Sequence, residues 1–259
     1  MRSYLDNFNF LMSIKFFLLI SLITLIFFNF FDIPVFQKSR DLHGLFFSFF
    51  KDYIDPLSDI LDPLNFIVLF VIFLLLSQNI NKLINNKPKF LLLVSKTGLT
   101  KTEILLIFNY YTLVLWHWLS SLIVAGIICN AIKFIIGVAR PKYFFLYNYE
   151  RLNFFNIEHK VNSFPSGHTQ AAFTVAILFL IYFQRYHLII IGVAMLMGLS
   201  RIFMSMHFPS DLIFGAYIGS LIPIVIYKFH FKFKFDKIKK TRSINFFTFC
   251  KLLYWRMFI

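Results

Sequence analysis

Two histidines, His168 and His207, are the residues of this chain whose type and surroundings best suit chemistry. An imidazole can take or give a proton near neutral pH, and it becomes a directed nucleophile when a carboxylate holds its other ring nitrogen. Asp211 follows His207 by four residues, close enough for its carboxylate to accept one imidazole N–H. We therefore interpret His207 as a nucleophile and Asp211 as the group that fixes its tautomer.

His168 stands where a turn opens into an apolar helix. The run Pro165-Ser166-Gly167-His168 is followed by the apolar residues 171–182. The first turn of a helix has backbone N–H groups without partners, and its dipole favours negative charge. Glycine lets a ligand come close to that backbone. The pattern predicts a phosphate site at which Ser166 and the N–H groups of Gly167 and His168 act as donors.

Three cations, Lys133, Arg140 and Arg201, lie at the ends of the neighbouring apolar segments. For any one of them alone, a side chain that snorkels at a helix end is the simpler explanation. Beside two histidines and a glycine turn, the three together favour an anion with several charged oxygens. Arg binds such oxygens through paired N–H groups, and Lys acts as a point charge.

A phosphate held in this way is expected to react in two steps. His207 attacks phosphorus in line and forms a phosphohistidine, while His168 protonates the departing alkoxide from the opposite side. His168 then activates the water that releases phosphate. We expect no metal and no cofactor, because no acidic pair or Cys/His cluster has the spacing of a metal site.

The elements that must position these residues are membrane helices. The chain of 259 residues is 59% hydrophobic, far more than a soluble domain of that length, and several apolar runs approach the length that spans hydrocarbon. We predict an all-α fold, a polytopic bundle of six transmembrane helices forming a single integral membrane domain over residues 1–259. The predicted spans are 16–35, 60–78, 112–133, 168–185, 187–203 and 211–228. The first is interpreted as a span and not a cleaved signal, because no small-residue cleavage site follows it.

The distribution of charge predicts the orientation. With the N-terminus inside, the inner segments hold 17 cations and three acids, whereas the outer segments hold nine of each. The positive-inside rule favours this arrangement, with both termini cytoplasmic. It places the site residues at the outer end of the bundle. The basic tail, 229–259, is interpreted as cytoplasmic and in contact with anionic lipid headgroups; we expect no nucleic-acid partner.

Three motifs of this chain resemble the signature of the type 2 phosphatidic acid phosphatase superfamily. That family includes membrane lipid phosphatases and, more distantly, soluble vanadium haloperoxidases. The motifs are Lys133-x6-Arg140-Pro141, Pro165-Ser166-Gly167-His168 and Ser200-Arg201-x5-His207-x3-Asp211. With the flanking helices, the resemblance covers about residues 112–228, and no signature position departs from the pattern.

The resemblance implies metal-independent hydrolysis of a lipid phosphate at an outward-facing site. It implies the roles given above for His207, Asp211 and His168. It also implies that the phosphate is held by Lys133, Arg140, Ser166, Gly167 and Arg201. The substrates expected are phosphomonoesters or diphosphates of lipids, such as phosphatidic acid, phosphatidylglycerophosphate, undecaprenyl diphosphate or the phosphates of lipid A.

Three other functions remain open at this point. The same site can pass phosphate to a second lipid, which makes a phosphotransferase. A haloperoxidase would bind vanadate, although six spans speak against it. A non-enzymatic lipid-binding or transport protein would leave the histidines idle. If the source is bacterial, we expect an envelope-lipid role at the inner membrane, with the site facing the periplasm, membrane lipids as surroundings and no obligate protein partner.

Overall fold

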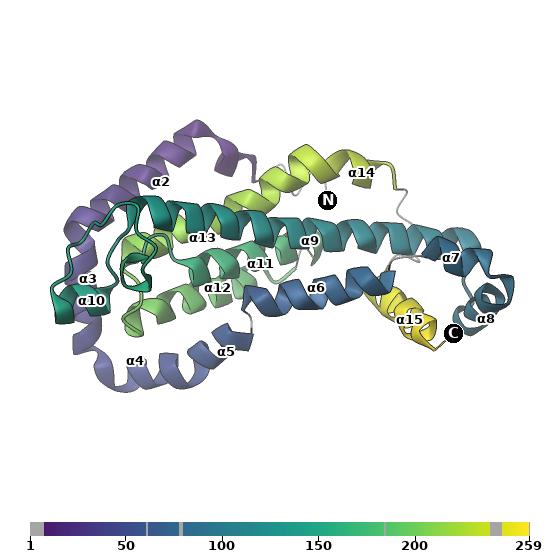
Figure 1. The fold of residues 1–259 in the computed structure, drawn as a ribbon, viewed down its shortest axis with the longest axis horizontal. Helices are drawn as coiled ribbons and strands as arrows, with labels where there is room; N and C mark the ends of the chain where they lie inside the picture. The colour runs from purple at the N-terminus through teal and green to yellow at the C-terminus, as the bar shows by residue number, and fades with distance from the viewer. Residues whose placement is uncertain (1–7, 61, 78–79, 184, 239–244, 259) are drawn as a thin grey trace. The chain divides into compact units, whose positions relative to one another are not determined.

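The computed structural model describes residues 8–60, 62–77, 80–183, 185–238 and 245–258. These residues fold almost entirely into helices (Figure 1), and their one strand-like feature is an isolated antiparallel bridge between Val138 and Leu152. The all-α prediction is confirmed to that extent. Part of the predicted basic tail, 239–244, and the inner-side Arg2 lie outside the described residues.

Within the described part of the chain, four helical stretches are long and apolar enough to cross a membrane. They are Ile14–Asp41, Phe46–Ser77, Lys101–Ile136 and Pro209–Asp236. Two further apolar helices, α11 (Gly167–Phe183) and α12 (His187–Phe203), have 17 residues each. At 1.5 Å per residue these rise roughly 26 Å, slightly less than the hydrocarbon thickness. The protein is a multi-pass membrane protein; the count of six spans, one for each of these stretches, stays a prediction.

The chain divides into two compact units. The first consists of residues 1–65 and 121–225, and the second of 66–120 and 226–259. All eight predicted site residues, from Lys133 to Asp211, belong to the first unit. The first unit therefore holds the whole predicted site.

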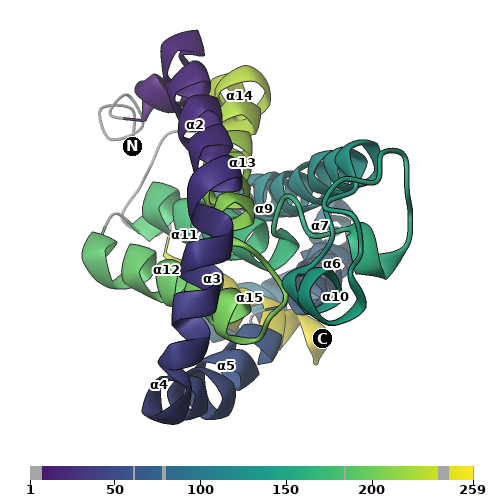
Figure 2. The ribbon, with the colours of Figure 1, turned by 90° about the vertical axis from the view of Figure 1, so that its left-hand side faces the viewer.

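The first unit begins with a run of helices that contains two π-helical turns, η2 and η3, and a break around Leu42 and Gly44. Ser13 starts it by accepting a hydrogen bond from the N–H of Phe16 at 3.2 Å, as an N-cap should. Figure 2 shows α2 and α3 following one another down the front of the view. The elements in this part are η1 (Asn9–Met12), α2 (Ile14–Ile26), η2 (Phe27–Phe31), α3 (Asp32–Asp41), α4 (His43–Phe49), η3 (Phe50–Ile54) and α5 (Asp55–Ile60).

Helices α11 and α13 (Pro209–Ile226) of this unit touch backbone to backbone. A Cβ added at Gly219 would lie 2.2 Å from the carbonyl oxygen of Gln170, and one at Gly215 would lie 2.6 Å from that of Ser166. Small residues four apart allow such close contact between membrane helices. The contact sets the start of α11 against the start of α13, and these two helix ends carry His168 and Asp211.

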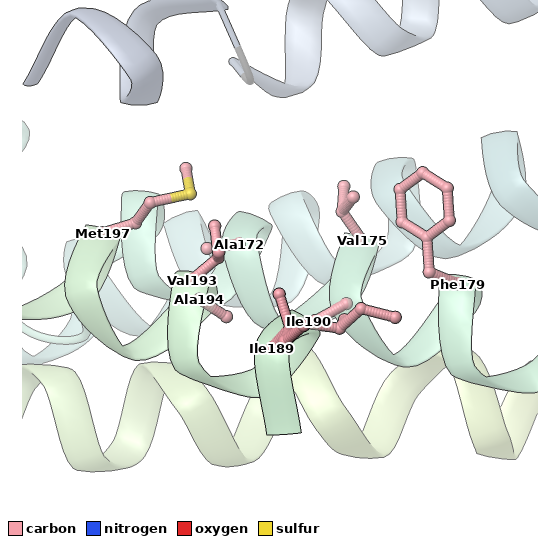
Figure 3. A pocket seen from close by; sticks show the side chains of 9 residues that line it. Ala172, Val175, Phe179, Ile189, Ile190, Val193, Ala194 and Met197 are labelled. Atoms are coloured by element: carbon pink, nitrogen blue, oxygen red, sulfur yellow. The ribbon is translucent and has the colours of Figure 1, made fainter. Parts of the chain in front are cut away.

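Helices α11 and α12 lie side by side (Figure 1). They pack along an apolar face, in which Ala172, Ala176, Ala194 and Met197 form a buried cluster. Beside them the two helices enclose an apolar groove of about 190 Å³. Figure 3 shows the side chains that line it, among them Val175 and Phe179 from α11 and Ile189 and Val193 from α12. The groove contains no charged group and is separate from the predicted site.

The loop between α9 (Lys101–Ile136) and α11 is held to itself by backbone hydrogen bonds. It contains α10 (Pro141–Tyr147) and η4 (His159–Val161). The N–H of Asn153 bonds to the carbonyl of Gly137 at 2.8 Å, and the N–H of Arg140 bonds to that of Lys160 at 2.9 Å. Gly137 has φ +59°, and a Cβ there would lie 1.8 Å from the Asn153 oxygen, so only glycine fits. The loop thus holds Arg140 in a defined place.

The second unit is a helical cluster built around the first part of α9. Glu103 accepts the N–H of Thr100 at 2.9 Å and donates its own to the Thr100 hydroxyl at 3.3 Å, a capping box that starts the helix. His117 is fully buried between the rings of Tyr227 and Phe231. The other elements are α6 (Pro63–Ser77), α7 (Ile80–Asn85), α8 (Lys87–Thr97), η5 (Tyr227–Phe231), α14 (Lys232–Asp236) and α15 (Phe246–Met257).

Candidate active site

The ends of several helices in the first unit surround one cavity of about 280 Å³. Five of the eight predicted site residues line it: Lys133, Arg140, Gly167, His168 and His207. Seven residues without an assigned role complete the wall: Asp62, Pro63, Gly126, Cys129, Asn130, Asn162 and Gln170. The two histidines therefore face the same space, although 38 residues separate them in the chain.

His207 is buried and has one ring nitrogen turned toward two oxygens. Its Nδ1 lies 3.3 Å from the hydroxyl of Ser163 and 3.4 Å from Oδ2 of Asp211. The Ser163 hydroxyl itself donates to the same Oδ2 at 2.5 Å. The orienting group is thus a pair, in which the serine hydroxyl and the carboxylate are bonded to each other and both face Nδ1. Because Nδ1 faces this pair, Nε2 is the nitrogen left for the cavity.

Asp211 is held by the start of its own helix. Pro209 is the first residue of α13, and Asp211 is the third; its Oδ2 accepts the N–H of Phe208 at 2.8 Å. A carboxylate at this position reaching back to the N-cap N–H is half of a capping box. Its other oxygen, Oδ1, is buried and accepts no hydrogen bond from the described residues.

The charge state of His207 follows from its surroundings. The residue lies between α12 and α13, and its burial lowers the pKa of the imidazole well below the ordinary value. The nearby positive charges of Lys133 and Arg140 lower that pKa further. His207 is consequently neutral at physiological pH, which is the form that can act as a nucleophile.

Lys133 and Arg140 are anchored by neutral oxygens. Lys133 Nζ donates to the backbone carbonyls of Asn162 at 2.6 Å and Ser163 at 3.3 Å. Arg140 donates from Nε and Nη2 to the side-chain oxygen of Asn162, at 3.1 and 2.8 Å. Asn162 therefore places both cations without cancelling their charge. Among the residues that line the cavity, two cations stand against one carboxylate, that of Asp62, which favours the binding of an anion.

Ser166 and Arg201, also predicted to bind phosphate, are not among the residues that line the cavity. The fully buried Ser166 has its N–H bonded to the carbonyl of Asp211 at 3.0 Å, and its hydroxyl accepts that of Thr169 at 2.9 Å. Arg201 forms an ion pair with Asp55 of α5. In this arrangement Ser166 joins α11 to α13, and Arg201 is paired with a carboxylate.

Several residues of the site carried no prediction. Asn162 and Ser163 directly precede the Phe164-Pro165 turn, and a hydroxyl and an amide so near a glycine turn are the signal that could have indicated them. Asp55 and Asp62 come from an acid-rich segment far upstream. No spacing rule connects that segment with the motifs, so only the fold reveals its place.

The described side chains contain no group of three or more His, Cys, Asp or Glu arranged to hold a metal ion. What the cavity does contain is a neutral imidazole, a second histidine and two cations. Positive groups and donors fixed around a small space suit a tetrahedral oxyanion. An imidazole can act as a nucleophile or exchange a proton, and these are the two functions that phosphoryl transfer needs.

Comparisons with known proteins agree with this chemistry. Lipid A 1-phosphatase of Rhizobium etli is 30% identical over 135 residues, which cover 51% of this chain and 56% of that protein. Lipid A 1-phosphatase of Rhizobium johnstonii is 32% identical over 118 residues, 44% of this chain and 48% of that protein. Bacitracin transport permease protein BcrC of Bacillus licheniformis is 33% identical over 72 residues, 27% and 36% of the two chains.

The chain spans about half the length of the curated lipid A phosphatases that it matches. No significant match was found among solved structures. Residues 114–235 match the sequence model of the PAP2 superfamily, and this region contains all eight predicted site residues. Over these residues, somewhat less than half of the chain, the protein is similar to the PAP2 superfamily.

Proposed function

We propose that the protein is a membrane lipid phosphatase that hydrolyses a lipid phosphomonoester or diphosphate without a metal ion. The observation that carries the proposal is the geometry of His207, which is faced by Ser163 and Asp211 and lines a cavity that it shares with His168, Lys133 and Arg140. A binding or transport protein has no need of an oriented neutral imidazole opposite a second one.

The reaction proceeds in two balanced steps. Nε2 of His207 attacks phosphorus, the P–O bond to the lipid breaks, and His168 gives a proton to the departing oxygen. For a phosphomonoester the leaving group is the lipid alcohol, and for a diphosphate it is the lipid monophosphate. His168 then takes a proton from water, which attacks phosphorus, breaks the P–N bond and releases inorganic phosphate.

The cations stabilise the charge of the transferring phosphoryl group. Lys133 and Arg140 stand at the cavity, and the N–H groups at the start of α11 add neutral donors. Arg201 also contributes a positive charge. Its guanidinium has five N–H donors, so it can bind a phosphate while it stays paired with Asp55.

The substrate class is a phosphorylated envelope lipid. The two Rhizobium relatives are named lipid A 1-phosphatases, which supports a glycolipid phosphate as the first compound to test. Phosphatidic acid, phosphatidylglycerophosphate and undecaprenyl diphosphate are the other members of the class. The excess of positive charge on the inner segments supports a site that faces the periplasm, with both termini in the cytoplasm of a bacterial cell.

The decisive experiment measures phosphate release by the purified protein from a panel of these lipids in mixed micelles. We expect release from at least one of them, unchanged by EDTA and inhibited by vanadate. Absence of release from every lipid would overturn the proposal in favour of a binding or transport function. A substrate with a radiolabelled phosphate, assayed with an added acceptor lipid, separates hydrolysis from phosphotransfer. Hydrolysis releases the labelled phosphate into solution, whereas transfer moves it to the acceptor lipid.

A further inference from the structure

One face of helix α3 carries an acid, an aromatic ring and a cation at regular spacing. Asp32, Phe36 and Arg40 are four residues apart, so they lie one above another on the same side of the helix. Asp32 and Phe36 are buried, at 1% and 5% exposure. All three precede residues 114–235, the region that matches the family, so the family match assigns them no role.

Asp32 binds the start of α13. Its Oδ1 accepts the backbone N–H of Ser210 at 2.8 Å, and its Oδ2 accepts the Ser210 hydroxyl at 2.6 Å. Ser210 is the second residue of α13, where backbone N–H groups have no partner within the helix and the dipole favours a negative charge. An ion pair with Arg151 at 2.5 Å holds the carboxylate in place. Asp32 therefore caps a helix that belongs to another part of the chain.

Arg40 binds the end of α12. Its Nη2 donates to the carbonyls of Ile202 at 3.0 Å and Phe203 at 2.7 Å, and its Nη1 donates to the Ser205 hydroxyl at 2.9 Å. The last carbonyls of a helix lack partners, and the dipole favours a positive charge there. Arg40 thus caps the end of α12, just as Asp32 caps the start of α13.

Phe36 fills the space between these two polar contacts. Its ring lies 5.8 Å from that of Phe208, at a steep angle, and 5.1 Å from that of Phe145, nearly parallel. Ile202 and Leu212 complete the buried cluster. The face of α3 consequently touches residues on both sides of His207, from 202 to 212.

We propose that α3 is a clamp that positions the catalytic segment, with Asp32 and Arg40 as its positioning residues. His207 lies in the short connection between α12 and α13, and Asp211 lies in the first turn of α13. The clamp fixes the separation of the two helix ends and thereby the direction of the imidazole. Small errors in the position of a nucleophile are costly, since a shift of about 1 Å can lower a rate by roughly a hundredfold.

The clamp rests on the proposed function and is tested with the full chain in micelles. Asp32→Asn and Arg40→Met are compared with Asp41→Asn and Lys38→Met, which make the same charge changes on the same helix. The side chains of Lys38 and Asp41 are 74% and 68% exposed and pair with each other. We expect kcat to fall roughly tenfold to a hundredfold in the first two variants, by the same positional argument, with KM changed less than about threefold. The controls keep kcat within about twofold of the wild type.

A purely structural role predicts a different result. Losing a purely structural contact would lower the amount of folded protein but leave kcat per folded molecule unchanged. We therefore measure the unfolding temperature of each variant and count its active sites by titration with vanadate, so that kcat is expressed per folded molecule. Arg40→Lys should recover part of kcat, because an ammonium can still donate to the helix carbonyls. Should Asp32→Asn not fold, Ser210→Ala removes only one of its hydrogen bonds and carries the test in its place.

The outcomes separate the two proposals. A wild-type protein that releases phosphate from no lipid refutes the proposed function. An active wild type whose Asp32, Arg40 and Ser210 variants match the Lys38 and Asp41 controls in kcat refutes the clamp alone. A fall in kcat at nearly constant KM, with partial recovery in Arg40→Lys, supports it.

Discussion

His207 combines three conditions that a nucleophilic imidazole needs. It is neutral because burial and two cations oppose its protonation, it is turned because Ser163 and Asp211 face one nitrogen, and it borders a cavity that admits a ligand. At the residue scale, the proposed chemistry depends on an imidazole whose Nδ1 is fixed by Ser163 and Asp211 and whose Nε2 is left to face the cavity.

Replacing the nucleophile tests this directly. His207→Ala should abolish phosphate release while leaving substrate binding within about threefold, because Lys133 and Arg140 remain. Release is measured with the lipid that the wild type hydrolyses, and binding by displacement of a fluorescent analogue. The exposed His230 offers a control, and His230→Ala should behave like the wild type. Turnover by the His207 variant would reject its role as nucleophile.

Ser163 is predicted to act through His207. Ser163→Ala removes the hydroxyl that faces the imidazole and bonds to Asp211 but leaves the carboxylate, so we expect kcat to fall about tenfold, the size of one buried hydrogen bond. Ser163→Thr retains the hydroxyl and should recover part of this loss. The trapped phosphohistidine, measured by rapid quench, should form more slowly in proportion. Equal rates in the wild type and Ser163→Ala would exclude the serine from the orienting pair.

The lowered pKa of His207 predicts the acid side of the pH profile. The imidazole attacks only when neutral, and its pKa in the folded protein lies below the ordinary value of about 6.5. As pH falls through 6.5, kcat/KM should therefore hold, and it should decline only at clearly lower pH. Lys133→Met removes one of the charges that lower this pKa, so its acid limb should move to higher pH. An acid limb centred at or above 6.5 in the wild type would contradict the assignment.

At the scale of elements, the site depends on how closely helices approach. Residues from α9, α11 and the connection between α12 and α13 meet at one cavity only because α11 and α13 touch through Gly215 and Gly219. The clamp face of α3 acts at the same scale, since it ties the end of α12 to the start of α13.

Enlarging one of these glycines should separate the helices. In Gly219→Ala the new Cβ would lie 2.2 Å from a backbone oxygen of α11, so the helices must shift, at a cost of about 1–3 kcal/mol. We expect a lower unfolding temperature and at least tenfold lower kcat. Gly192→Ala on α12 is the control, because nothing lies within 4 Å of its added Cβ. Equal stability and activity of the two variants would show that the contact is not required.

At the scale of the whole molecule, orientation in the membrane decides which leaflet supplies the substrate. A cysteine placed by Glu150→Cys, in the loop after α10, should react with an impermeant maleimide in intact cells. One placed by Lys237→Cys, after α14, should react only once the membrane is opened. Both positions are exposed, and Cys250→Ser removes the more accessible native thiol, since Cys129 is buried. The reverse labelling pattern would invert the topology.

Much of this protein follows from its sequence because the relevant signals are local. Apolar runs near the length of a bilayer predict helices, since lipid leaves the backbone no other partners. The spacing from His207 to Asp211 and the turn before α11 indicate groups that meet within one helical turn. These are contacts between residues a few positions apart, so the local conformation of a helix start and the turn before it is enough to bring them together.

Contacts between distant segments were decided by the tertiary structure alone. The contact of Ser163 with His207, the pairing of Arg201 with Asp55, and the caps supplied by Asp32 and Arg40 join residues 44 to 178 positions apart. Such pairs have no period in the sequence, because they depend on how closely whole helices pack. Two glycines on α13 set one such approach, and the face of α3 sets another.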